Sequence, residues 1–172
     1  MRTSLRTQLV FVGCVLAFAA WASDVTGLQG TYKHAPDQSN DVSQAIDKAV
    51  EKMNFIKRPI ARSRLAKTNT PYQRIHIELG VDEAAVTFDT RQPIRTPLDG
   101  RPIKWTRDDG EVFEISATLA DGKLLQTFKA ADGTRVNSFH KDASGALHLD
   151  VEVSSSQLPQ PVKYELVYRP VS

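Results

Sequence analysis

The sequence is poor in cysteine. Among its 172 residues the only cysteine is Cys14, which lies in an apolar run near the N-terminus. The rest of the chain therefore forms no intramolecular disulfide, and burial and hydrogen bonding must hold the fold together. That part of the chain also has no cysteine nucleophile, and it has no activated-serine motif. We expect a protein that is not an enzyme.

Histidine is scarce as well. The four histidines are His34, His76, His140 and His148. No two of them have the spacing that is typical of zinc ligands. We therefore predict neither a metal site nor a cofactor.

The chain has little net charge. Lys and Arg together number 22, Asp and Glu number 20, and the formal net charge is +2. Arg2 and Arg6 near the N-terminus account for this excess, so the basic and acidic residues of the remaining chain are equal in number. A neutral chain of this kind argues against nucleic acid as a partner.

Long apolar runs are missing too. The run over residues 9–20 is too short to span a bilayer comfortably, and it follows a basic start that contains Arg2 and Arg6. It ends at Ala20-Trp21-Ala22, which has the small-x-small form of a signal-peptidase site. We predict a secretory signal peptide over residues 1–22 and a single domain over residues 23–172. We expect an exported protein, either periplasmic or secreted.

Two alternatives stay open for this first segment. The apolar run could remain uncleaved as a membrane anchor, although it is short for that purpose. Val12-Gly13-Cys14 also resembles a lipoprotein processing site, to which Phe11 is a poor fit.

Turn signals are abundant in the second half of the chain. Alternating apolar runs over residues 101–153 are separated by pairs that end in glycine. These pairs are Asp99-Gly100, Asp109-Gly110, Asp121-Gly122, Asp132-Gly133 and Ser144-Gly145. Aspartate and glycine tolerate the positive φ that tight hairpin turns require. The pattern predicts an up-and-down antiparallel meander.

The first half adds one strand and a helical segment. Residues 28–33 are typical of a short strand, and Ser39 or Asn40 can cap an amphipathic helix that continues to Met53. Pro59 opens a second helical stretch, so we expect a helical lid over about residues 40–67. After Pro71 the apolar residues alternate, which is typical of strands. We predict a mainly β protein with about ten strands in an up-and-down barrel.

Pairing across each turn predicts which side chains share a face. We expect Leu119 opposite Leu124, Gln126 opposite Ser138, and Leu124 opposite His140. This register predicts an apolar inner face made of Ile103, Trp105, Phe113, Ile115, Leu119, Leu124, Phe128, Val136, Leu147, Leu149 and Val151. Its polar inner members are Gln126, Thr134, Ser138 and His140. The predicted outer face holds Lys104, Glu114, Lys129, His148, Asp150 and Glu152, so His140 and His148 are expected on opposite faces.

A resemblance to a known superfamily rests on the order of these elements. The chain resembles the calycins, because a helical pair and a long meander follow a strand that bears Gly30-Thr31-Tyr32-Lys33. The likeness is to the intracellular lipid-binding, fatty-acid-binding-protein-like branch and to lipocalin-like barrels, here in exported form. It implies a helical lid between the first two strands and reversible carriage of a fatty acid or another lipid.

The resemblance breaks down at the carboxylate-binding residues. The family holds a carboxylate with inward arginines and a tyrosine, and Tyr168 occupies the tyrosine position. Leu166 and His140 occupy the positions of the two arginines. With no inward Arg or Lys expected in the meander, the predicted ligand is a fatty acid or a neutral hydrophobic small molecule, the neutral type being favoured.

The predicted ligand-binding residues are the inner aromatic and polar side chains. They are Trp105, Phe113, Gln126, Phe128, Ser138, His140, Tyr164 and Tyr168. In one alternative, Gln126 and Ser138 simply satisfy each other across the sheet. In another, aromatic side chains fill the barrel, and the protein acts as a protein-binding, inhibitor or envelope scaffold module.

The segment over residues 52–74 is strongly basic. It contains seven Lys and Arg residues and no acid. Transient contact with an anionic membrane surface through Lys57, Arg58, Arg62 and Arg64 is one interpretation. A solvated helical face is the alternative.

Overall fold

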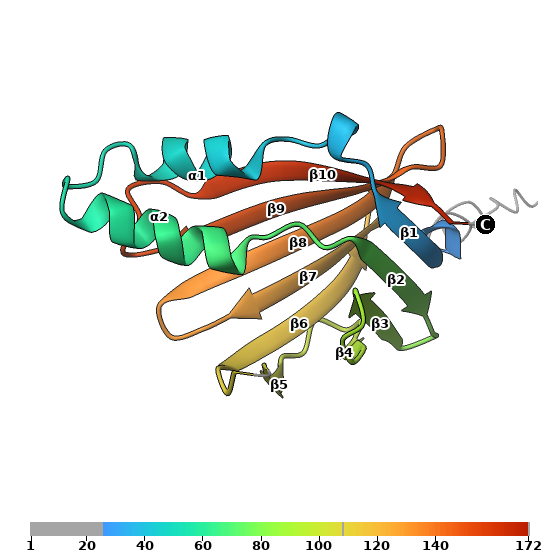
Figure 1. The fold of residues 1–172 in the computed structure, drawn as a ribbon. Helices are drawn as coiled ribbons and strands as arrows, with labels where there is room; N and C mark the ends of the chain where they lie inside the picture. The colour runs from blue at the N-terminus through green and yellow to red at the C-terminus, as the bar shows by residue number, and fades with distance from the viewer. Residues whose placement is uncertain (1–25, 108, 172) are drawn as a thin grey trace, which may run out of the picture.

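The computed structural model describes residues 26–107 and 109–171, so the predicted signal peptide lies outside the described residues (Figure 1). Two helices and ten strands follow one another along the chain, with short 3-10 turns at Thr26–Leu28 and Pro36–Gln38. The elements are β1 (Gly30–His34), α1 (Val42–Val50), α2 (Lys57–Thr68), β2 (Arg74–Leu79), β3 (Glu83–Phe88), β4 (Ile94–Pro97), β5 (Ile103–Thr106), β6 (Val112–Ala120), β7 (Lys123–Lys129), β8 (Gly133–Lys141), β9 (Leu147–Ser155) and β10 (Val162–Pro170).

The ten strands form one antiparallel sheet in the order β4-β3-β2-β1-β10-β9-β8-β7-β6-β5. The sheet curls until its two ends approach each other, and Figure 1 shows β2, β3 and β4 beside the right-hand ends of β6 and β7. At the seam, Asp99 bridges to Thr118, and the Gly100 amide donates to the Ala117 carbonyl at 3.0 Å. The result is a nearly closed barrel with helices between its first two strands, which confirms the predicted fold class.

The predicted register is correct on β5, β6 and β7. Trp105 lies opposite Phe113, and Leu119 lies opposite Leu124. It is wrong on β8, where Leu124 lies opposite Phe139 and Gln126 lies opposite Asn137. Because strand side chains alternate between faces, this one-residue shift exchanges the two faces of the whole strand.

The cause of the error is the β7–β8 turn. The expected pairing centres that turn on Asp132, but the Ala130 amide bonds to the Gly133 carbonyl at 2.9 Å, so Ala131 and Asp132 form its centre. Gly133 begins β8 without a positive φ, whereas Asp121 (φ 51°) and Gly122 (φ 72°) form the centre of the β6–β7 turn. Two Asp-Gly pairs thus occupy different places in their turns.

The predicted register is also one residue off across the β8–β9 turn, where a three-residue loop ends at Gly145 (φ 85°) and brings His140 opposite His148. This shift of one residue compensates for the first. The inward positions of Leu147, Leu149 and Val151 on β9 are therefore as predicted.

The helical lid lies across one end of the barrel (Figure 1). Helix α1 is capped by Asp41, whose Oδ1 accepts from the Ser43 and Gln44 amides at 2.8 and 3.3 Å. The predicted caps Ser39 and Asn40 instead accept from β10 amides, at 2.9 and 2.8 Å, and fix the approach to the helix. No helix of the described residues is both long and apolar enough to cross a membrane.

Candidate functional site

An aromatic group lines the inner wall beside the lid. Trp105, Phe113 and Phe128, here called the mouth aromatics, have ring centroids 5.9 to 6.4 Å apart. Trp105 and Phe113 are only half-buried, whereas Phe128 is nearly covered. Tilted and edge-on ring pairs of this kind are favourable, and they keep an apolar surface within reach of solvent.

Two arginines flank this apolar mouth. The Arg107 guanidinium lies 5.3 Å from the Phe113 ring centre, and Arg91 lies 5.5 Å from that of Tyr72. Tyr72 packs in turn on Phe88 with a centroid distance of 4.4 Å. Positive charge above aromatic faces is stabilising in itself. The Arg107 guanidinium also pairs with Asp109 at 2.6 Å and with Glu111 at 2.5 Å, so its charge is compensated locally.

Polar side chains lie one step deeper. The strand pairing places Gln126, Asn137 and Tyr164 in one row across β7, β8, β9 and β10, and each is at most 5% exposed. Arg135 is half-buried in the neighbouring row, directly opposite Phe128. These four residues, together with Asn69 at the end of α2, are called the inner polar group.

Arg135 joins the barrel to the lid. Its Nε donates to Asn137 Oδ1 at 2.8 Å, and its Nη1 donates to Asn69 Oδ1 at 3.2 Å and to the Thr68 carbonyl at 3.4 Å. Tyr164 Oη donates to the same Asn69 oxygen at 3.0 Å. A guanidinium at the C-terminal end of a helix is favourable because carbonyl groups point there. No carboxylate of the described residues pairs with Arg135.

Three interior polar atoms have no partner among the described residues: Gln126 Oε1, Tyr168 Oη and Thr96 Oγ1. A buried polar atom without a partner costs about 1 to 3 kcal/mol, so these atoms favour an additional donor or acceptor. Burial raises the pKa of Tyr164 and of Tyr168 and keeps both hydroxyls protonated. The Tyr164 proton is already donated to Asn69, whereas the Tyr168 hydroxyl is free to donate to an anion.

The floor of the barrel is closely packed. Leu124, Phe139, Leu149 and Leu166 form the next row, and none of them is more than 2% exposed. An internal space large enough for a water molecule would expose the side chains around it, so these four residues line no such space. A long chain entering the barrel must therefore displace these side chains.

The structure places six of the eight predicted site residues on the inner face. They are Trp105, Phe113, Gln126, Phe128, Tyr164 and Tyr168. Ser138 and His140 lie on the outer face, because the register of β8 is shifted by one residue. The same shift brings Arg135 and Asn137 inward, which corrects the expectation that the meander has no inward Arg or Lys. The Asp132-Gly133 pair does not reveal them in the sequence, because Gly133 begins β8 and does not form the centre of the turn.

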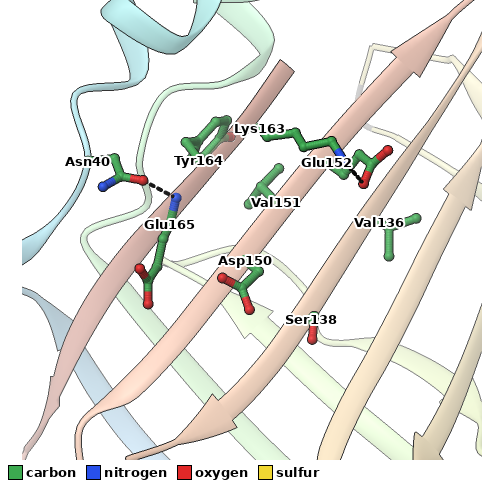
Figure 2. Close-up of a pocket in the computed structure, with 9 residues that line it drawn as sticks. All are labelled: Asn40, Val136, Ser138, Asp150, Val151, Glu152, Lys163, Tyr164 and Glu165. Atoms are coloured by element: carbon green, nitrogen blue, oxygen red, sulfur yellow. Dashed lines mark hydrogen bonds and ion pairs between the residues drawn. The ribbon is translucent and has the colours of Figure 1, made fainter. Parts of the chain in front are cut away.

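Two hollows lie outside the barrel interior. One, of about 370 Å³, follows the outer wall of β8, β9 and β10, where Figure 2 shows Asp150 and Glu165 projecting to the same side. It is lined by Asn40, Val136, Ser138, Asp150, Val151, Glu152, Lys163, Tyr164 and Glu165. The other, of about 280 Å³, lies between the helices and is lined by Asp47, Val50, Glu51, Arg58, Pro59 and Arg62. Both are open and charged at their edges, unlike a closed apolar pocket.

These features define a ten-stranded barrel with a helical lid, and solved structures, fatty-acid-binding proteins among them, share this fold. A REP1-NXSQ fatty acid transporter matches with a TM-score of 0.55 and 16% identity, over 86% of this chain and 98% of that one. A fatty acid binding protein from Schistosoma mansoni, in complex with arachidonic acid, has a TM-score of 0.54 and 15% identity, over 87% and 99%. A secretory abundant heat soluble (SAHS) protein from Ramazzottius varieornatus has a TM-score of 0.57 and 9% identity, over 84% and 96%.

At these identities the likeness shows the fold, and it confirms the fold implied by the resemblance in sequence. No family model matches the chain. No curated protein matches it either.

Proposed function

We propose that this protein is an exported barrel that binds a lipid with one acidic group. The observation that carries the proposal is Arg135, an inward guanidinium without a carboxylate partner among the described residues, beside the apolar surface of Phe128. An anionic head group would supply the missing partner, and charge-assisted hydrogen bonds are the strong ones. The mouth aromatics would cover the first part of the acyl chain.

Three further observations support an acid over a neutral ligand. The rim carries Arg91, which pairs with no carboxylate among the described residues. The buried Tyr168 hydroxyl has no partner among the described residues and would donate to an acidic group. Solved barrels of this fold include a fatty acid transporter and a complex with arachidonic acid. Support for export comes from the signal-like sequence over residues 1–22.

The test compares a fluorescent fatty acid with its methyl ester in a binding titration. Arg135→Met should weaken binding of the acid about 10- to 100-fold, because hydrogen bonds to a charged group contribute about 1.5 to 3 kcal/mol. It should change binding of the ester less than about 2-fold. Arg135→Lys should recover part of the loss, since it keeps the charge.

Arg95→Met is the matched control, because Arg95 lies on the outer face and pairs with Glu83 at 3.0 Å. Native mass spectrometry of protein taken from its own host would identify a co-purified lipid. Equal losses for acid and ester in Arg135→Met, with an unchanged unfolding midpoint, would contradict an acid-specific role.

The closely packed floor favours a second function. A barrel filled by its own side chains would act through its outer face, as a protein-binding, inhibitor or scaffold module. Saturable binding of neither the acid nor the ester would support this second function and contradict the first. Cross-linking in the native compartment would then identify the partner.

We further propose that the lid touches anionic membranes while it exchanges ligand. Phe55, Ile56 and Ile60 are exposed by 78%, 61% and 54%. Lys57, Arg58, Arg62 and Arg64 surround them, although Arg62 also pairs with Asp47 at 2.5 Å. Exposed apolar side chains among basic ones are typical of segments that lie on a membrane surface.

Vesicle co-sedimentation tests the membrane contact. Ile56→Ser combined with Ile60→Ser should reduce binding to phosphatidylglycerol vesicles several-fold. Val81→Ser is the matched control, because Val81 is 96% exposed and lies in the turn between β2 and β3, outside the lid. Equal binding by both variants would refute the contact.

A further inference from the structure

Two histidines lie side by side on the outer wall, where the sequence predicted them on opposite faces. His140 on β8 and His148 on β9 are direct cross-strand partners. Their rings are stacked, with centroids 5.0 Å apart and planes inclined by 23°. Glu165 projects from the neighbouring strand, β10, on the same face, as Figure 2 shows for its carboxylate. Three adjacent strands thus bring two imidazoles and a carboxylate together.

The ligand atoms of this group already lie close to one another. One atom from each of His140, His148 and Glu165 lies within 4.8 Å of the others. His148 Nδ1 is hydrogen-bonded to the Glu165 carboxylate. His140 Nδ1 is buried and has no hydrogen-bond partner among the described residues, and its nearest acid, Asp150 Oδ2, is 3.5 Å away.

A fourth residue fixes the orientation of His148. Asp142 Oδ1 accepts from the Ser144 amide, the Ser144 hydroxyl and the Ala146 amide at 2.9, 2.7 and 2.9 Å, which anchors it in the β8–β9 turn. Its other oxygen lies 3.3 Å from His148 Nε2. A carboxylate that holds one ring nitrogen of a histidine leaves the other nitrogen aimed at a metal.

We propose that His140, His148 and Glu165 bind one divalent transition-metal ion of the zinc class, and that Asp142 positions His148 for it. Two imidazoles and one carboxylate suit such an ion, and a water molecule would complete a tetrahedral set. Bonds of about 2.0 to 2.2 Å require the three ligand atoms to move closer together. Exposures of 28%, 19% and 41% leave these side chains room to do so. The competing explanation is an ion pair in which His148 is held between Glu165 and Asp142 without any metal.

Calorimetric titration of the untagged, chelator-treated protein with zinc chloride tests the site. We expect one equivalent of zinc to bind, and magnesium, which prefers an all-oxygen set, not to compete. His140→Gln and Glu165→Gln should each weaken zinc binding at least 10-fold, and Asp142→Asn about 10-fold. Cobalt should give the intense visible absorption of a tetrahedral site and lose it in His140→Gln.

His76→Gln is the matched control. His76 also lies beside a carboxylate, that of Glu78 at 3.2 Å, but no second histidine faces it. It should bind zinc as the unaltered protein does. Circular dichroism must show each variant folded. Lack of a one-equivalent site at millimolar zinc, or a site that survives in both His140→Gln and Glu165→Gln, would overturn the proposal and support the ion pair.

Discussion

Replacing Asn69 should release the lid from the barrel. Asn69 is 2% exposed, and its Oδ1 accepts from both Tyr164 and Arg135. Asn69→Ala removes this acceptor and leaves the Tyr164 hydroxyl buried and unpaired, which costs about 1 to 3 kcal/mol. Arg135 keeps its bonds to Asn137 and to the Thr68 carbonyl, so its loss adds about 0.5 to 1 kcal/mol. We expect the free energy of unfolding to fall by about 1.5 to 4 kcal/mol.

A double-mutant cycle separates the unpaired hydroxyl from the other losses. Tyr164→Phe alone removes a donor and leaves Asn69 bonded to Arg135, so it should cost about 1 kcal/mol. In Asn69→Ala/Tyr164→Phe no hydroxyl needs an acceptor. The double variant should therefore lose at least about 1 kcal/mol less than the sum of the single variants. Urea unfolding at neutral pH measures all three.

Hydrogen exchange locates the effect. Amides of α2 should exchange faster in Asn69→Ala, while those of β7, β8 and β9 should keep the protection of the whole fold. Asn54→Ala is the matched control, because Asn54 Oδ1 accepts from the Ile56 amide at the opposite end of the lid, at 2.8 Å. Single-variant losses that add within about 0.5 kcal/mol, or α2 exchange that equals that of Asn54→Ala, would refute the reasoning.

Three further predictions concern the turn, pH and processing. Gly133→Ala should destabilise the fold by about 1 to 3 kcal/mol in urea unfolding, because the added Cβ would lie 2.9 Å from the Ser154 carbonyl oxygen. Gly27→Ala is the control, because a Cβ there meets nothing within 4 Å and the change should be neutral. Burial lowers the pKa of His34 below 6.5, so at this site the unfolded chain binds more protons between the two pKa values. The contribution of His34 to stability should be full above about pH 6.5 and fall as the pH is lowered, and His34→Gln should remove that part of the pH dependence. The mass of protein isolated from its host should correspond to a chain that begins at Ser23 if the signal peptide is cut after Ala22.

The sequence predicts the fold well because its signals are local and redundant. The Asp-Gly pairs, the alternation of apolar residues and the helical spacing after Asp41 each indicate the same barrel with a lid. For Trp105 and Tyr164, the neighbouring turns and the spacing of apolar residues both predict the inner face. If one of these elements lacked its sequence pattern, the patterns of the others would still specify the barrel with its lid.

The sequence does not predict which side chains of β8 face inward. Its inward and outward side chains are both mixed, with Phe139 and Arg135 on one face and Val136 and His140 on the other. Alternation therefore does not choose between them, and the register depends on how many residues each turn uses. Gly133 serves a close backbone approach to Ser154 and not a positive φ, so an Asp-Gly pair alone misplaces the turn by one residue. Asn69 could not be placed either, because its partners lie far away along the chain.

The same three strands carry both proposed sites, on opposite faces. Arg135 and Asn137 project inward from the strand that projects His140 outward, and Tyr164 and Glu165 are neighbours on β10. A zinc ion outside would tie β8, β9 and β10 together, yet it would touch none of the bonds between the lid and the barrel. Ligand entry that needs only the lid to open should therefore proceed at the same rate with and without zinc. Entry that also needs the closely packed strands to shift should slow when zinc is bound, so stopped-flow uptake of a fluorescent fatty acid distinguishes the two routes.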